Sequence, residues 1–393
     1  RSVRADTLDF SNPLFLVGKN GAGKSNVVDA LAFLAEAMTS PLHTVFDRRG
    51  GISAVRHQSG ARSRPPSISL AIELVDLDSG HPIRYAVEIK AAKDGGFSVA
   101  REQAVSTGRM IRLRKSGGTL SRGRRVEVWF DRRNTDFRSS MEGFAPAIDP
   151  QGLVLPLVGG YLGFRTLTTA ITGMRVYSLE PSKLRDFQEP DSGTILHRNG
   201  SNVASVLKEI EHRSSDDMLR IRELLAAVVP HTDSVTTVSH GNRLGLEFTQ
   251  AWRDDRSVRF EALNMSDGTL RVLGLLVAVY QKKKPSLMVI EEPESTLHPE
   301  ALGALSDVLA HGARETQMVV TTHSPELLDS ADVGEDNLRL VQWGQGETTV
   351  RGVSAAAREA LQQHLMGAGE LLRSNGLRSS STPKEAPYFF HDF

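Results

Sequence analysis

The apolar residues near the start of the chain predict a strand, a loop and a helix, in that order. Leu14 to Val17 form a short continuous apolar run, as in a buried strand. Apolar residues then recur at helical spacing from Val27 to Met38, and Pro41 lies just beyond the expected end of the helix. The stretch between them, from Gly18 to Ser25, is rich in glycine and is expected to be a loop.

The period of the pattern changes to two between Ser67 and Phe130. Apolar and polar residues alternate there in three runs, which Gly-containing polar breaks separate: 68–74, 83–89 and 125–130. This alternation predicts an antiparallel β-meander with one face in water. Residues 134–156 have little periodicity and are expected to form a loop.

Strands and helices alternate in the second half of the chain, which predicts an α/β core. Two amphipathic helices are expected between Ser201 and Val229, with a break near Ser214. Ser266 opens a strongly apolar helix, and Leu287 to Ile290 form an apolar strand that is expected to be buried and parallel. The remaining expected elements are helices at 162–171 and 299–311 and strands at 174–179, 244–248, 257–260 and 318–321.

The composition is that of a globular protein without an overall charge bias. Of 393 residues, 39% are hydrophobic, which is enough apolar content for a sizeable core. Lys and Arg total 47, as do Asp and Glu, so any basic surface for nucleic acid must be local. The absence of cysteine excludes disulfides, thiolate metal sites and thiol catalysis, and it fits a cytoplasmic location. No apolar run approaches the ~20 residues that span a bilayer, so no membrane association is expected.

The glycine-rich loop fits the pattern G-x-x-x-x-G-K-[ST], which binds nucleotide phosphates where it joins a strand to a helix. Gly18, Gly21 and Gly23 allow backbone N–H groups to approach the phosphates without Cβ clashes. Lys24 is expected to reach the β- and γ-phosphates of a nucleotide, and the Ser25 hydroxyl is expected to bind Mg²⁺. The alternative is a simple glycine-rich turn that precedes a helix.

Two adjacent carboxylates, Glu291 and Glu292, follow the apolar strand at 287–290. Ligands of open α/β sheets bind at the carboxyl ends of the strands, where these two groups are expected to lie. Glu291 suits a carboxylate that holds Mg²⁺, and Glu292 suits a group that polarises the attacking water. A strand that ends in solvated acids is the alternative, and the presence of the phosphate loop argues against it.

Four motifs occur in an order that resembles an ABC-type ATPase head. Residues 18–25 resemble Walker A, 265–269 the ABC signature, 289–299 Walker B with the D-loop, and 321–325 the H-loop. The residue patterns of these motifs are similar to those of OLD-like ATPases in the RecF/SMC branch, also called AAA-type ABC-like ATPases. The resemblance covers about the first 35 residues and residues 262–330, and it is loose between them.

The resemblance implies an α/β P-loop NTPase fold of ABC-ATPase type, with an antiparallel β-meander in lobe I and a helical insertion before the signature. Residues 1–393 would then form one ABC-type ATPase domain with four parts. These are lobe I with the P-loop and meander at 1–180, the helical insertion at 181–243, the lobe with signature, Walker B and H-loop at 244–353, and a C-terminal helix and tail at 354–393.

The resemblance also implies that two heads pair head-to-tail as a homodimer, or within a larger oligomer, and enclose two ATP molecules. Ser266 and Gly268 of one head would contact the γ-phosphate held by the other, and His323 would sense the γ-phosphate. Lys24, Glu292 and His323 would be catalytic, and Ser25 and Glu291 would hold Mg²⁺. The nucleotide-binding residues of the loop would be Gly18, Asn20, Gly21, Ala22, Gly23, Lys24, Ser25 and Asn26. The alternatives are that Ser266 only caps a helix and that His323 is structural.

The chain departs from the patterns of related ATPases in several places, and these departures argue against some of their functions. The signature lacks the second glycine and the glutamine of transporters, which argues against a transport ATPase. The helices are too short for coiled-coil arms, which argues against an SMC-type DNA clamp. Too little chain follows His323 for a Toprim domain like that of OLD nucleases, so no nuclease activity is expected in this chain. The Q-loop stays unassigned among three candidates: Gln58, Gln103 and Gln188.

Basic residues gather in and after the meander, where they could form a groove for DNA or RNA phosphates. They are Arg109, Arg112, Arg114, Lys115, Arg122, Arg124, Arg125, Arg132, Arg133 and Arg138. The alternative is a solvated hairpin that acids elsewhere balance, and no series of aromatic residues for base stacking accompanies the charges.

Three functions follow from these expectations. The first, which the OLD-like resemblance implies, is an ATPase or sensor subunit of a bacterial antiviral defence or toxin–antitoxin system that controls a separate effector such as a nuclease. The second is a RecF-like ATPase of DNA repair or recombination, which requires the basic cluster to bind DNA. The third is a scaffold that binds ATP without hydrolysis, and the presence of Glu292 argues against it.

Overall fold

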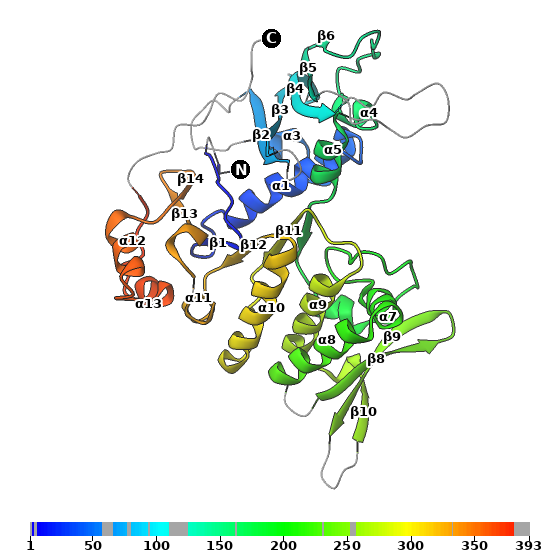
Figure 1. The fold of residues 1–393 in the computed structure, drawn as a ribbon, viewed down its shortest axis with the longest axis vertical. Coiled ribbons are helices and arrows are strands. Elements are labelled where there is room, and N and C mark those ends of the chain that lie inside the picture. Colours follow the sequence, from blue (N-terminus) through cyan, green and yellow to red (C-terminus); the bar gives the residue numbers. More distant parts are fainter. Residues whose placement is uncertain are drawn as a thin grey trace.

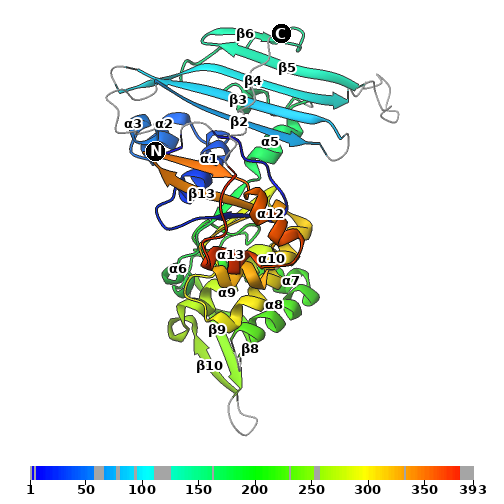
Figure 2. The same cartoon turned by 90° about the vertical axis from the view of Figure 1, so that its left-hand side faces the viewer.

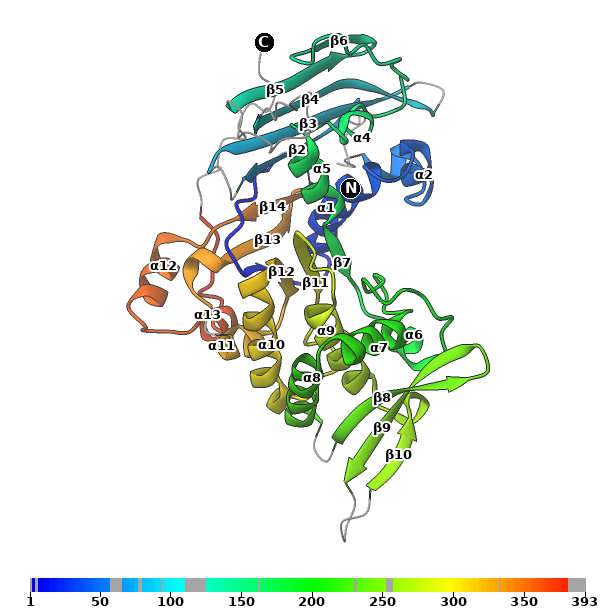
Figure 3. The ribbon, with the colours of Figure 1, turned by 45° about the vertical axis from the view of Figure 1, so that its right-hand side comes forward.

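The computed structural model describes residues 2–3, 6–56, 66–76, 80–92, 95–109, 125–161, 163–229, 232–251, 257–331 and 333–380. Three regions follow one another along the long axis of the molecule (Figures 1 and 3). A five-stranded sheet lies at one end and a six-stranded sheet lies in the middle, while helices and a three-stranded sheet occupy the other end.

The central sheet is mixed and has the order β14-β13-β1-β12-β11-β7. Its strands are β1 (Leu14–Val17), β7 (Arg175–Tyr177), β11 (Leu287–Glu291), β12 (Gln317–Thr322), β13 (Leu338–Gly344) and β14 (Glu347–Arg351). Strand β1 runs parallel to β12 and β13, β11 runs parallel to β12 and β7, and only the β13–β14 pair among these is antiparallel. The expected buried parallel strand at 287–290 is therefore confirmed. The sheet contains strands from two expected parts of the chain: β1 and β7 from lobe I, and β11 to β14 from the segment 244–353.

Strand β1 shows why the central strands are apolar throughout. Leu14 and Leu16 belong to the core on one face of the sheet, together with helix α1 (Lys24–Ala37). Phe15 and Val17 belong to the core on the other face, together with helices α9 (Asp267–Tyr280) and α10 (Leu302–Glu315). Because both faces are covered, no position of the strand meets water.

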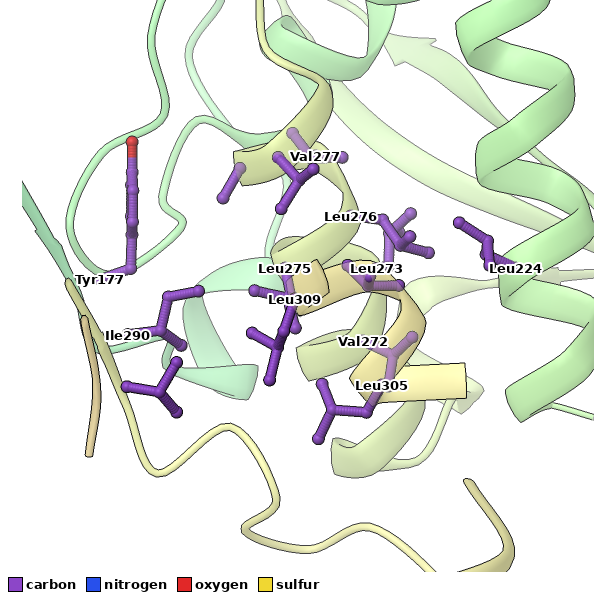
Figure 4. Packing of buried hydrophobic residues seen from close by; sticks show 14 of the residues in the cluster. Tyr177, Leu224, Val272, Leu273, Leu275, Leu276, Val277, Ile290, Leu305 and Leu309 are labelled. Carbon is purple, nitrogen blue, oxygen red and sulfur yellow. The ribbon is translucent and has the colours of Figure 1, made fainter. Parts of the chain in front are cut away.

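The core on the second face is built around α9, which is buried on all sides (Figure 4). Leu275 and Leu309 lie on the side of Ile290 of β11, while Val272 and Leu305 lie about one turn earlier in α9 and α10. Full burial of one such side chain contributes about 1.5–3 kcal/mol. This packing explains why the helix that starts after Ser266 has no polar face.

The five-stranded sheet confirms the expected meander, since its order is β2-β3-β4-β5-β6 and every pair is antiparallel (Figure 2). Its strands are β2 (Ser67–Val75), β3 (Pro82–Ala91), β4 (Phe97–Arg109), β5 (Arg125–Arg133) and β6 (Asp136–Ser139). The expectation of a loop throughout 134–156 is wrong, because β6 and the short helix α4 (Leu155–Val158) lie there. Strand β6 folds back on β5 through a two-residue turn in which Asn134 has φ 54°. Four residues are too few to show a period in the sequence.

The far end of the molecule holds helices and a second antiparallel sheet. Helices α7 (Val203–Arg213) and α8 (Ser215–Val228) confirm the expected pair, and Ser214 caps α8 by accepting the N–H of Asp217. The sheet contains β8 (Thr232–His240), β9 (Arg243–Ala251) and β10 (Ser257–Glu261). The segment expected as a helical insertion therefore also carries β8. Only Thr232 and Val235 of this strand are buried, so its sequence has no two-residue period.

Short helices complete the fold. They are α2 (Leu42–Asp47), α3 (Ile52–Val55), α5 (Arg165–Thr172), α6 (Pro181–Arg185), α11 (Pro325–Ser330), α12 (Ala355–Gln362) and α13 (Ala368–Arg373). The helix expected at 299–311 begins as a tight turn at Pro299–Ala301 and continues as α10 to Glu315. Within the described ranges, no helix combines the length and apolar character needed to cross a membrane.

The basic cluster does not form a single surface in the described residues. Arg132 has no exposed surface, and its guanidinium donates to the backbone oxygens of Asn134, Asp149 and Gly152. Its Nη1 lies 3.8 Å from Oε2 of the equally buried Glu102. Burial lowers the pKa of Arg132, and the Glu102 charge opposes that shift. The expectation that Arg132 could meet nucleic acid phosphates is therefore wrong.

The other described members of the cluster are paired with acids. Nε of Arg133 lies 3.1 Å from Asp131, and Nε of Arg138 lies 3.9 Å from Asp136. Five members lie outside the described residues, as do the side chains of Arg109 and Arg125. The five are Arg112, Arg114, Lys115, Arg122 and Arg124.

Replacing Arg132 by alanine is expected to lower the free energy of unfolding by about 3–5 kcal/mol, because it leaves the Glu102 charge buried without its partner. Urea unfolding followed by circular dichroism measures the change. Arg138→Ala is the matched control, since its side chain is 70% exposed. We expect the control to lose less than about 1 kcal/mol. Equal losses in the two variants would contradict the structural role of Arg132.

Candidate active site

The glycine-rich loop follows β1, and its last two residues, Lys24 and Ser25, are the first two residues of α1. Gly21 and Gly23 have φ values of 79° and 105°, which side chains with a Cβ rarely adopt. A Cβ on Gly18 would lie 2.3 Å from the Val341 oxygen, and one on Gly23 would lie 2.3 Å from Oγ1 of Thr348. The loop therefore requires glycine both for its conformation and for its close contact with β13 and β14.

Lys24 is the first residue of α1, three residues before the helix start that the sequence pattern predicts. Its side chain is 6% exposed, and Nζ donates to the Gly18 oxygen at 2.6 Å. The same Nζ lies 3.4 Å from Oε1 of Glu292. Ser25 follows on the exposed side of the helix start. The structure thus brings Lys24 to the carboxylate at the end of β11.

The two predicted carboxylates point in different directions. Glu291 is the last residue of β11, and its Oε2 lies 3.5 Å from Nη2 of Arg198. Glu292 has φ 44°, and its N–H donates to both the backbone oxygen and the hydroxyl of Thr321 on β12. This left-handed backbone directs Glu292 to Lys24, while Glu291 continues the strand.

His323 joins the same group of side chains. Its Nδ1 lies 3.4 Å from Oε1 of Glu292 and 3.9 Å from Oε1 of Glu294. The imidazole follows directly after β12 and is 43% exposed. The structure therefore brings Lys24, Glu292 and His323 together at one edge of the central sheet.

Glu294 accepts hydrogen bonds from Thr322 and from the backbone of His323, a role that the sequence pattern did not predict. Its side chain is 7% exposed, and Oε1 accepts the Thr322 hydroxyl at 2.5 Å and the His323 N–H at 3.3 Å. Its Oε2 is buried and has no hydrogen-bond partner within the described part of the chain. The only signal for this residue is its place two residues after Glu292, which does not reveal which way it points.

The signature residues form a second group at the start of α9. Ser266 caps this helix by accepting the N–H of Thr269 at 3.1 Å, and it lies on the surface. Gly268 is buried, and a Cβ there would lie 2.8 Å from the Thr296 oxygen. Arg185 donates to the Met265 oxygen and to Asp267, so α6 holds the segment that leads into the helix.

The described Q-loop candidates are structural. Gln188 is buried, donates to the Lys183 oxygen and accepts the Ala204 N–H. Gln103 is buried within β4, and Gln58 lies outside the described residues. The segment after β7 instead carries Arg198 to Glu291, since the Arg198 oxygen accepts the Ser178 N–H at 3.0 Å. No feature of the sequence pattern singles out Arg198.

The site fits a phosphate chain with a divalent cation better than an isolated metal centre. A Cβ on Gly21 would meet no atom of the described residues within 4 Å, so these residues leave space open beside the loop. The part of the chain that the structure describes holds no group of three or more His, Asp or Glu residues that suits a metal ion. Mg²⁺ commonly takes only one or two protein oxygens beside phosphates and waters, which Ser25 and Glu291 could supply.

The fold and the site together define the class of protein: an α/β P-loop protein with the ATPase fold seen in SMC heads. The chain belongs to the family described as "AAA domain, putative AbiEii toxin, Type IV TA system", whose sequence model matches residues 14–149 and 155–329.

Solved heads of SMC proteins have a similar fold. An SMC head bound to the C-winged helix domain of ScpA matches with a TM-score of 0.55 and 17% identity, over 90% of this chain and 93% of that one. An SMC head with an extended coiled coil from Pyrococcus furiosus, bound to the C-terminal domain of ScpA, has a TM-score of 0.48 and 16% identity, over 91% and 94%. No curated protein matches the chain.

Replacing Glu294 by alanine is expected to lower the free energy of unfolding by about 1–3 kcal/mol, because the Thr322 hydroxyl and the His323 N–H lose their buried acceptor. Glu294→Gln is the matched variant, since its amide oxygen can accept both bonds. We expect it to lose less than the alanine variant in urea unfolding. A glutamine variant as unstable as the alanine variant would show that the charge of Glu294, rather than its hydrogen bonds, supports the site.

Proposed function

We propose that the chain binds ATP with Mg²⁺ and hydrolyses it. The observation that carries this proposal is the meeting of Lys24, Glu292 and His323 at the edge of the sheet where the glycine-rich loop begins. Phosphoryl transfer needs positioning and charge neutralisation, and this group offers a cation, a carboxylate and an imidazole within a few ångströms of one another.

The backbone N–H groups of residues 18–26 would surround the phosphates, with the start of α1 adding its partial positive charge. Lys24 would exchange the Gly18 oxygen and Glu292 for phosphate oxygens. This exchange frees Glu292 to accept a proton from a water molecule. The water oxygen would then bond to the γ-phosphorus while the bond to the β–γ bridging oxygen breaks, giving ADP and phosphate. His323 would donate to the γ-phosphate.

Mg²⁺ supplies positive charge at the phosphates when it is bound. We propose that the Ser25 hydroxyl and Glu291 hold it, because both lie at the same sheet edge as Lys24. Arg198 now pairs with Glu291 at 3.5 Å and would have to give up that contact. Its side chain is 52% exposed, so it can move without unpacking the core.

Two heads are proposed to act together. Ser266 lies exposed at the start of α9, where a helix N-terminus attracts anions, and a second head could present its γ-phosphate there. Gly268 is covered by Thr296 of its own chain, so its contact with a partner's nucleotide would require that segment to shift. A head-to-tail homodimer of this kind contains two ATP molecules between the same pair of surfaces.

We further propose that the ATPase is a subunit of a bacterial defence or toxin–antitoxin system and controls a separate effector protein. The family description, which names a type IV toxin–antitoxin system, supports this role. The similar SMC head is itself bound to a domain of another protein, which supports partner binding by heads of this fold. A nuclease is the effector class that the OLD-like resemblance implies.

The RecF-like alternative is not favoured by Arg132, Arg133 and Arg138, which are buried or paired with acids.

The Glu292→Gln variant is expected to turn over ATP about 10²–10⁴-fold more slowly, because the amide cannot accept the proton of the attacking water. ATP binding should persist, and the ATP-bound dimer should accumulate. Phosphate release and size-exclusion chromatography with ATP measure the two effects. Glu300→Gln is the control, since it makes the same substitution on a side chain that is 91% exposed. Unchanged hydrolysis by Glu292→Gln would remove Glu292 from the catalytic role.

The same assay with duplex DNA separates the two biological roles. We expect turnover to be indifferent to DNA, as in an ATPase that awaits a protein partner. A strong increase with DNA would favour the repair alternative over the defence proposal.

A further inference from the structure

The β13–β14 hairpin forms one wall of the phosphate loop. The Val341 oxygen lies against Gly18, and the Thr348 side chain lies against Gly23. Oγ1 of Thr348 also donates to the Ala22 oxygen at 3.0 Å. A group on this face of the hairpin, beyond these contacts, lies beside whatever the loop binds.

Trp343 is such a group. It lies directly opposite Thr348 in the hairpin, and directly opposite residues of paired strands project to the same face. Val341, two residues earlier on that face, is 1% exposed, whereas Trp343 is 61% exposed. The row of side chains that covers the loop therefore ends in an indole that is open to water.

The hairpin holds this indole on a rigid element. Its turn is the two residues Gln345 and Gly346, with φ values of 54° and 84°, a turn that matches the natural twist of the strands. On its other side, β13 pairs with β1, where Leu340 lies opposite Val17. An indole needs only two side-chain torsions to be fixed, so stacking against it costs little conformational entropy.

The order of strands places Trp343 away from the catalytic side chains. Strand β1 lies between β13 on one side and β12 with β11 on the other. Glu292 and His323 follow β11 and β12, so the terminal phosphate belongs on that side of the loop. The opposite end of a nucleotide, which carries the base, would then extend toward β13.

We propose that Trp343 is the surface on which the base of the bound nucleotide stacks, an inference that rests on the proposed binding of ATP by the loop. The ligand class is a purine nucleotide, because two fused rings cover more of an indole than one ring does. Stacking uses the face of the base and leaves its edge unread, so the surface accepts adenine and guanine alike.

The test compares nucleotides with a phosphate chain that lacks a base. Trp343→Ala is expected to weaken ATP and GTP binding about tenfold, since stacking on an aromatic side chain contributes about 1–3 kcal/mol per base. Inorganic tripolyphosphate, measured by competition, should bind the variant and the wild type equally. Trp343→Phe should keep most of the affinity for ATP. Trp129→Phe, on β5, is the control and should leave all affinities unchanged.

Fluorescence adds a second measurement. Replacing Trp129 and Trp252 by phenylalanine leaves Trp343 as the single tryptophan, because the chain has three. ADP should then quench the emission, and tripolyphosphate should leave it unchanged.

The outcomes separate this inference from the proposed function. If the wild type binds neither ATP nor tripolyphosphate, both ideas are wrong. If Trp343→Ala binds ATP as tightly as the wild type does, the loop binds nucleotide but the base lies elsewhere. If the variant loses affinity for ATP and tripolyphosphate equally, Trp343 supports the loop or a subunit contact, and the stacking role is overturned.

Discussion

The contact between Lys24 and Glu292 is the interaction on which the rest of the site depends. A lysine amine with so little exposure must be paired, and the Gly18 oxygen and Glu292 supply its partners. These residues can meet only if the carboxyl ends of β1 and β11 lie at one edge with β12 between them, which the order of the central sheet provides. The apolar strands and the two cores that cover them therefore serve to bring one cation and one carboxylate together.

The phosphate loop lies between two walls of different character. The ends of β11 and β12 form an acidic wall, in which His323 is exposed, Glu292 is half-buried and Glu294 is buried. The β13–β14 hairpin forms the other wall, which is polar near the loop at Thr348 and aromatic at its open end. A bound nucleotide is asymmetric in the same sense, with charge at one end and a flat ring at the other. The two walls would therefore fix the orientation of a nucleotide in the loop as well as contribute to its binding.

The sequence predicted those parts of the molecule whose local pattern is decisive. The glycines of the loop, the helix break near Ser214, the cap at Ser266 and the apolar strand before Glu291 each carry their own signal, because a turn, a helix start or a buried strand restricts the residue type. Strand β8 was missed because few of its residues are buried. Arg132, Glu294 and Arg198 were misjudged or missed for another reason. Their roles depend on partners distant in the sequence, such as Glu102 or Glu291, which a single sequence does not reveal.

The left-handed backbone of Glu292 has a consequence for how the protein can change. A residue with a Cβ in this conformation stores about 1–3 kcal/mol of strain, which the surrounding hydrogen bonds to Thr321 must hold in place. Glycine would adopt the same φ without strain, so loss of this carboxylate relaxes the turn that presents it. The same change would leave the buried Lys24 amine without its carboxylate, so the strain and the ion pair make opposite demands on this position. The strained turn therefore marks the place where the backbone and the proposed catalytic carboxylate are in conflict.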